Sequence, residues 1–312
     1  MIEATGLTKR YGKTLAVNNL SFSVSAGQVT GFLGPNGAGK STTMRMILGL
    51  DNPTGGQVTI GGKKYHDLKE PLRTVGALLD AKWVHPNRSA RAHLQWMAKS
   101  NRIPAARVDE VLETVGLTSV AGKRAGGFSL GMSQRLGIAA ALLGDPEVLL
   151  FDEPVNGLDP EGILWIRKFM HRLADEGRTV FVSSHLLSEM ALTASNLVVI
   201  GRGQLISQSS TEDFVARAAE NTVKVRSPQL AELRDALQRA SAGVTGDGTA
   251  LVVSGMDSDK IGEIAAANGI VLHELSPQTG SLEQAFMQIT GDSVEYHTGL
   301  DAEAQHVLES AK

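Results

Sequence analysis

Hydrophobic residues in the first two thirds of the chain fall into short runs that end at glycine, proline or charged residues. The runs at 29–33, 148–151 and 179–182 predict strands buried on both faces, as the strands of parallel sheets are. Residues 161–176 instead space their apolar side chains for one face of a helix, which we assign to the core. Strands that alternate with helices in this way predict an α/β fold.

Two further patterns flank these strands. Short strands are predicted within residues 1–30 and at 56–60, which together would form an N-terminal β subdomain. Residues 85–145 are predicted to be a largely helical insertion, in which Ser89 is the N-cap of the first helix.

The composition shifts after about Ser209, which predicts a second, small α+β domain. Its role is open between regulation and support of a dimer. Its predicted strands are 223–226, 250–253 and 270–273, and its predicted helices are 228–240, 257–267 and 281–290. The predicted division is therefore a first domain at 1–208, an accessory domain at 209–291 and a polar, flexible tail at 292–312.

The overall composition excludes several classes of protein. The 312 residues carry a net charge of −3 and no cysteine, which argues against a nucleic-acid partner, disulfides and thiolate metal sites. The eight histidines show no metal-binding spacing. No apolar run approaches the roughly 18–20 residues that span a bilayer, and the start Met1-Ile2-Glu3 is unlike a signal peptide. If the protein serves transport, we expect another chain to form the pore.

Residues 34–42 fit the phosphate-binding pattern G-x-x-x-x-G-K-[ST]. They lie between a predicted strand and a predicted helix, the context that this motif requires; a plain glycine-rich turn is the alternative. Inward-facing amides and the start of the helix would attract phosphate. Lys40 is expected on the β- and γ-phosphates and Ser41 on Mg²⁺. The predicted nucleotide-binding residues of the loop are Gly34, Pro35, Asn36, Gly37, Ala38, Gly39, Lys40, Ser41 and Thr42.

Two acidic residues follow the predicted strand at 148–151, at the end of a strand where open α/β sheets bind their ligands. Asp152 is expected to hold Mg²⁺ through water, and Glu153 to act as general base for the attacking water. An acidic turn without catalytic function is the alternative. His185 ends the next predicted parallel strand and is expected to reach the γ-phosphate, unless it is only a polar group satisfied at a strand end.

Residues 128–135 (Phe-Ser-Leu-Gly-Met-Ser-Gln-Arg) open a predicted helix. They resemble the signature Leu-Ser-Gly-Gly-Gln-x-Gln-Arg of the ATP-binding-cassette (ABC) transporter ATPases. This resemblance implies that Ser129 and Gly131 contact a γ-phosphate bound by a second protomer. It also implies that Asp159 belongs to the D-loop of the same interface and that Tyr11 stacks on adenine.

The resemblance covers residues 3–205 and departs from the family pattern in three places. Leu130 stands in place of a signature glycine, and Met132 and Ser133 replace polar signature residues. Asp80 occupies the position of the Q-loop glutamine, where it offers a hard oxygen to nucleotide-bound Mg²⁺ but has a shorter reach. The acidic residue at position 80 and the residues Met132 and Ser133 resemble the drug-export branch of the family.

The family resemblance implies an ATPase subunit that uses ATP and Mg²⁺ and packs head to tail with a second copy around two ATP molecules. It implies a separate membrane-spanning permease, with the subunit at the cytoplasmic face of the cell membrane. The branch resemblance implies export of drugs, antibiotics or other hydrophobic compounds. Trp83, which follows the Q-loop, is either an anchor for the permease or a core residue. Pairing with a sister ATPase in place of an identical copy stays open.

Three rival functions share the phosphate-binding loop. A cassette ATPase acting on ribosomes or DNA is disfavoured because the chain has one cassette and no heptad arm. A GTPase is disfavoured because no Asn-Lys-x-Asp motif is present. A nucleotide sensor without hydrolysis is disfavoured by Glu153 and His185.

Overall fold

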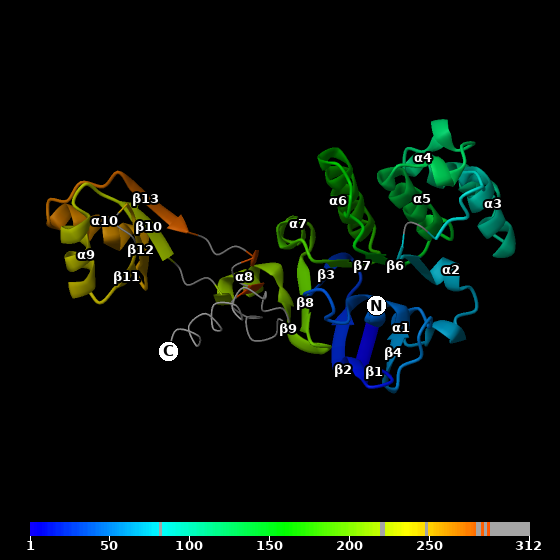
Figure 1. Ribbon diagram of the computed structural model, residues 1–312, viewed down its shortest axis with the longest axis horizontal. Helices are drawn as coiled ribbons and strands as arrows, with labels where there is room; N and C mark the ends of the chain where they lie inside the picture. Colours follow the sequence, from blue (N-terminus) through cyan, green and yellow to red (C-terminus); the bar gives the residue numbers. More distant parts are fainter. Residues whose placement is uncertain (81–82, 219–221, 247–248, 279–281, 284–285, 288–312) are drawn as a thin grey trace, which may run out of the picture. The chain divides into compact units, whose positions relative to one another are not determined.

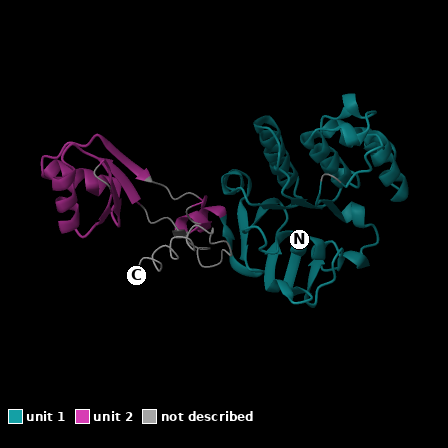
Figure 2. Ribbon diagram, in the orientation of Figure 1, with its two compact units in different colours: residues 1–210, 292–312 teal, residues 211–291 magenta. Residues whose placement is uncertain are grey.

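The chain divides into two compact units, residues 1–210 and residues 211–291, which Figure 2 colours teal and magenta. The predicted flexible tail at 292–312 and most of the predicted helix at 281–290 lie outside the described residues. The computed structural model describes residues 1–80, 83–218, 222–246, 249–278, 282–283 and 286–287.

A six-stranded sheet forms the centre of the first unit, with the strand order β5-β6-β7-β3-β8-β9. All neighbouring pairs are parallel except β8 and β9, two strands that were not predicted. Strands β3, β6 and β7 are almost wholly buried, as their continuous apolar runs predict. The strands are β3 (Gln28–Leu33), β5 (Val75–Leu78), β6 (Val148–Asp152), β7 (Thr179–Ser184), β8 (Asn196–Gly201) and β9 (Gln204–Ser210).

A second, antiparallel sheet completes the core of this unit. It has the order β2-β1-β4 and consists of β1 (Ile2–Tyr11), β2 (Thr14–Val24) and β4 (Gly55–Ile60). The rings of Phe22, Phe32 and Phe181 come from β2, β3 and β7, and their centroids lie between 5.0 and 5.7 Å apart. The two sheets therefore share one hydrophobic core.

The helices of the first unit include a separate group, α3, α4 and α5, which contact one another and form the expected helical insertion (Figure 1). No helix among the described residues is long and apolar enough to cross a membrane. The helices are α1 (Lys40–Ile47), α2 (Pro71–Thr74), α3 (Ala90–Ser100), α4 (Ala106–Thr114), α5 (Leu130–Leu142), α6 (Pro160–Asp175) and α7 (Leu187–Thr193), with short 3₁₀ turns at Tyr65–Asp67, Thr118–Val120 and Ala125–Gly127.

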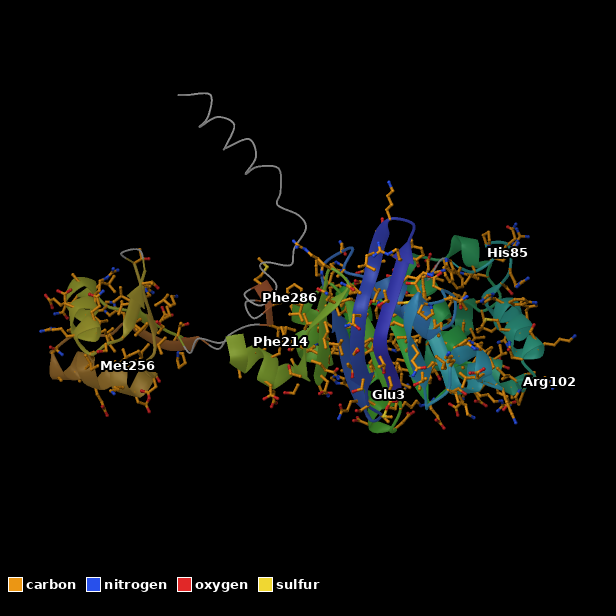
Figure 3. The ribbon with its side chains drawn as sticks, turned by 90° about the horizontal axis from the view of Figure 1, so that it is seen from below. Glu3, His85, Arg102, Phe214, Met256 and Phe286 are labelled. Carbon is orange, nitrogen blue, oxygen red and sulfur yellow. The ribbon has the colours of Figure 1, made fainter. Side chains whose placement is uncertain are left out.

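The second unit contains a four-stranded antiparallel sheet of order β11-β12-β10-β13. From β10 to β13, which include α9 and α10, the elements follow the β-α-β-β-α-β order of ferredoxin-like domains. Met256 belongs to its core, and Phe214 and Phe286 of the same unit are also buried (Figure 3). The elements are α8 (Thr211–Ala218), β10 (Thr222–Arg226), α9 (Leu230–Arg239), β11 (Gly243–Thr245), β12 (Leu251–Ser254), α10 (Ser258–Ala267) and β13 (Glu274–Gln278).

The predicted last strand at 270–273 is wrong, because the strand begins at Glu274. Ile270 is buried in the core but Val271 is exposed, so the apolar run marks the approach to the sheet and not the strand itself. Pro277 argues against a strand from sequence alone, yet β13 lies at the edge of the sheet, where proline is tolerated. The short strand β11 was not predicted.

Candidate nucleotide-binding and catalytic site

The phosphate-binding loop joins the carboxyl end of β3 to α1, as predicted. Gly39 has a φ angle of 99°, and a Cβ atom there would lie 2.6 Å from the carbonyl oxygen of Ala16. Both the dihedral angle and the lack of space require glycine. No side chain caps the start of α1, so its first amides are available to an anion such as phosphate.

Lys40 is buried at the first position of α1. Its Nζ donates hydrogen bonds to the carbonyl oxygens of Gly34 (2.6 Å) and Pro35 (3.2 Å), and it lies 3.9 Å from Oε1 of Glu153. Burial lowers the pKa of Lys40 below its ordinary value, and the carboxylates of Glu153 and Asp152 partly oppose this shift. The ammonium group is therefore held in the loop, where an approaching phosphate could replace its carbonyl partners.

A pocket of about 250 Å³ opens over the loop and reaches Glu153. The structure thus brings together the two motifs that are about 110 residues apart in the sequence. The pocket is lined by Ala16, Asn36, Gly37, Gly39, Lys40, Ser41, Thr42 and Glu153.

The two adjacent acidic residues differ in backbone conformation. Asp152 is the last residue of β6, and it pairs in register with Ser183 of β7. Glu153 has a φ angle of 49°, in the left-handed region that side chains other than glycine seldom adopt. This turn places the Glu153 carboxylate beside Lys40, in the pocket that Asp152 does not line.

His185 follows the end of β7, and its ring Nδ1 lies 2.8 Å from Oε2 of Glu153. The backbone N–H of His185 points at the same oxygen at 3.4 Å. The predicted partner of this side chain was a γ-phosphate, and its partner in the structure is the carboxylate of Glu153. The exposed ring is therefore positioned by the residue that lines the pocket.

Tyr11 lies at the end of β1 and is largely exposed, as an adenine-stacking residue must be. Its hydroxyl donates to Oδ2 of Asp51 (2.8 Å), which also accepts from Nε of Arg45 (2.7 Å). The ammonium of Lys9 lies 4.9 Å from the ring centroid. Desolvation and the neighbouring Asp51 raise the pKa of Tyr11, while a hydrogen bond with Thr42 of the loop opposes this shift.

The signature and D-loop segments meet each other on the surface of the first unit. Ser129 caps α5 by accepting the N–H of Met132, and Asp159 caps α6 by accepting the N–H of Gly162. A Cβ atom on Gly157 would overlap a methyl group of Leu130, so the two segments are in contact. Neither Ser129, Gly131 nor Asp159 lines the pocket around Lys40.

Asp80 lies two residues beyond β5 and is exposed; it does not line the pocket around Lys40. Trp83 and Trp96 are 61% and 56% exposed. The interpretation of Trp83 as a core residue is therefore wrong, and its use as a surface contact stands as the other alternative.

The donor atoms at the pocket suit Mg²⁺ bound together with a nucleotide. Ser41 lines the pocket, and Asp152 supplies a carboxylate at the end of β6, one strand removed from β3. The described residues contain no group of three histidine, cysteine or acidic side chains that could hold a metal alone. A magnesium ion that shares its ligands with phosphates and water needs only one or two protein oxygens, so the residues present fit it.

Two residues that shape this site were missed by the sequence analysis, Ser183 and Asp51. Ser183 hydrogen-bonds both to the carboxylate of Asp152 and to the backbone of Glu153. Asp51 holds the hydroxyl of Tyr11. Each lies in a different segment from its partner, so no local motif could indicate either contact.

A mainly parallel sheet, a phosphate-binding loop after β3 and paired carboxylates at the end of β6 define a P-loop nucleoside triphosphatase. Comparison with known proteins narrows this class. Residues 17–156 match the family model described as ABC transporter, and residues 221–283 match a domain of unknown function.

The bacitracin transport ATP-binding protein BcrA of Bacillus licheniformis is 38% identical over 304 residues, which cover 93% of this chain and 97% of that relative. The protein of the same name from Enterococcus faecalis is 36% identical over 302 residues, with coverage of 93% and 96%. The dimeric structure of a bacterial ABC transporter cassette matches with a TM-score of 0.62 at 25% identity, covering 68% of this chain and 99% of that one.

The chain belongs to the family of ATP-binding subunits of ABC transporters. It is an ATPase of that family and carries the fold of the ABC cassette.

Proposed function

We propose that two copies of this subunit pack head to tail around two ATP molecules. The observation that carries this proposal is the division of the predicted ATP contacts within one chain. Lys40 and Glu153 line one pocket, whereas Ser129 and Gly131 lie outside it, in the signature segment that contacts the D-loop. A phosphate that needs both groups of contacts must take the second from another protomer.

In this arrangement the residues of the pocket have distinct roles. Lys40 and the loop amides bind the phosphates and stabilise the charge of the transferring phosphoryl group. Ser41 and Asp152 would hold Mg²⁺, which neutralises phosphate charge. Glu153 accepts a proton from the attacking water, and His185, 2.8 Å from its carboxylate, keeps that carboxylate in place.

The proposed membrane partner is a separate multi-spanning permease, which would hold the subunit at the cytoplasmic face of the cell membrane. A hollow of about 360 Å³, lined largely by apolar residues but with nearly equal polar and apolar surface, lies beside the Q-loop segment and suits a helix end of such a partner. The exposed Trp83 precedes this hollow in the chain, and His85 lies in the same segment (Figure 3). The hollow is lined by Val84, Pro86, Ala125, Gly126, Phe128, Leu130, Ser133 and Leu136.

The proposed cargo is an antibiotic or a similar hydrophobic compound, which the complex exports. This proposal rests on relatives named for bacitracin transport that match over nearly the whole chain, the second unit included. The permease, and not this chain, would select the compound.

Isolation of the subunit from its native membranes in mild detergent tests the transporter assignment. A stoichiometric membrane-spanning protein that co-purifies with the subunit is the expected result. Ribosomal proteins or DNA in its place would favour the alternative, a cassette ATPase that moves no solute.

The first prediction concerns the general base. We expect Glu153→Gln to bind ATP, to remain paired with a second copy and to lose nearly all hydrolysis, because an amide cannot accept the proton. Phosphate release and size-exclusion chromatography with and without ATP measure the two effects. Full turnover by this variant would remove Glu153 from the role of base.

A further inference from the structure

Ser183 lies on β7, between its neighbouring strands β6 and β3 in the central sheet. It is the fifth residue of β7, it pairs in register with Asp152 of β6 and with Phe32 of β3, and it is completely buried. A serine in the middle of a sheet core must find hydrogen-bond partners for its hydroxyl.

The Ser183 hydroxyl finds both partners in the adjacent acidic pair. It donates its proton to Oδ1 of Asp152, and it accepts the backbone N–H of Glu153 at 3.0 Å. A hydroxyl has one proton to donate, so the direction of the two bonds is unambiguous when Asp152 is ionised. One oxygen atom thus connects the two carboxylate-bearing residues.

The second of these bonds lies at the left-handed turn of the backbone. The φ angle of 49° at Glu153 persists only where the surroundings impose it, and the bond to Ser183 is one such restraint. The turn brings the Glu153 carboxylate to 3.9 Å from Lys40 and 2.8 Å from His185, while Asp152 stays in the strand.

We propose that Ser183 is a positioning residue for both carboxylates, an inference that rests on the proposed roles of Asp152 and Glu153. By occupying one oxygen of Asp152, the hydroxyl orients the other oxygen toward Mg²⁺. By holding the N–H of Glu153, it keeps the general base turned toward the attacking water. Outer partners of this kind orient the groups that bind a metal.

The neighbouring Ser184 provides a matched control. It is equally buried on the same strand, but successive side chains of a strand point to opposite faces. Its hydroxyl accepts the N–H of Leu186 at 2.9 Å. Ser183→Ala and Ser184→Ala therefore each remove one buried hydroxyl, and only the first removes a partner of the acidic pair.

The test has a binding readout and a kinetic readout. Calorimetry measures the affinity for ADP, which the protein cannot hydrolyse, in excess Mg²⁺ and in a chelator. We expect Ser183→Ala to reduce the gain in affinity from Mg²⁺ by about 10-fold or more, with unchanged affinity in chelator, and to reduce kcat for ATP by about 10- to 100-fold. Ser184→Ala should stay within about twofold of the wild type in both measurements.

The pair Ser183→Thr and Ser183→Val separates the hydroxyl from the space it fills. The two side chains have nearly the same shape, so any added bulk affects both alike and only threonine should retain the effect of Mg²⁺. Equal behaviour of the two variants, or normal values for Ser183→Ala, would overturn the proposal. Asp152→Ala should also lose the effect; if it keeps the effect, the proposed metal role of Asp152 fails together with that of Ser183. If only Ser183 proves silent, the role of Asp152 stands.

Discussion

Individual side chains in this ATPase are held by partners that lie far from them in the sequence. Tyr11 on β1 is fixed through Asp51, which Arg45 of α1 holds in turn. The hydrogen bond from Arg45 is the largest cause of the lowered pKa of Asp51, and the bond from Tyr11 acts in the same direction. The aromatic ring therefore has a preset position, which would reduce the entropy lost on binding if Tyr11 stacks on adenine as the family resemblance implies.

We expect Asp51→Asn to weaken nucleotide binding by a few-fold, because the amide holds Tyr11 and Arg45 less firmly than the carboxylate does. Tyr11→Phe should have a similar effect, since it keeps the ring and loses the bond, whereas Tyr11→Ala should be the weakest binder. Equilibrium binding of ADP measures all three. Equal affinities for the alanine and phenylalanine variants would contradict stacking of the ring on the base.

His93, in the helical insertion, makes the stability of the protein depend on pH. The side chain is buried on α3, and burial, followed by the nearby charge of Arg88, lowers its pKa below the ordinary 6.5. Below about pH 6.5 the unfolded chain then binds a proton that the folded chain does not bind, so the free energy of unfolding falls as the pH falls through that range.

We expect His93→Gln to remove this contribution, which amounts to at most about 1.4 kcal/mol per pH unit. Urea unfolding of both proteins at pH 7.5 and pH 5.5 measures it. The variant should lose less stability on acidification than the wild type. An equal loss in the two proteins would show that the histidine has the same pKa in the folded and unfolded chains.

At the scale of elements, Leu130, which stands in place of a signature glycine, packs the start of α5 against the turn before α6. Its methyl group lies over Gly157, whose φ angle is 70°. The guanidinium of Arg135 on α5 lies 4.2 Å from the ring centroid of Trp165 on α6, which adds a second contact between the two helices. The signature and the D-loop are therefore placed by one another.

Gly157→Ala should disturb this contact, and Gly177→Ala is the matched control. Gly177 also has a positive φ angle, 88°, but has open space around its Cβ position. Both variants should lose about 1–2 kcal/mol of stability through backbone strain at a positive φ angle. The added methyl group at Gly157 should cost little more stability, because the half-exposed Leu130 can rotate away from it. Only the change at Gly157 should then lower ATP hydrolysis, as measured by phosphate release. An equal fall in both would assign the effect to strain alone.

At the scale of the whole molecule, one chain in the proposed function supplies only half of the residues of each catalytic site. A mixture of two inactive variants tests this. Lys40→Ala damages the phosphate-binding loop, and Ser129→Arg blocks the signature. In a mixed pair, one site combines the intact loop of one chain with the intact signature of the other.

We expect phosphate release from the mixture to reach about a quarter of the wild-type rate, since half of the pairs are mixed and each has one intact site. Each variant alone should be nearly inactive. If the mixture is no more active than its components, the sites are not shared between chains.

The sequence by itself determined the nucleotide chemistry of this protein. The loop at 34–42, the acidic pair Asp152-Glu153 and the burial of β3, β6 and β7 follow from contiguous residues, because a loop that binds phosphate and a strand that is buried on both faces are local patterns.

Only the tertiary structure decided which distant side chains contact the residues of these motifs. Ser183 meets Asp152 through strand register, Asp51 meets Tyr11 across two segments, and Leu130 meets Gly157 between two helix starts. The start of β13 likewise depends on its pairing with β10, and so the apolar run before it was misleading. Such contacts are set by packing between distant segments, and no pattern within one segment carries that information.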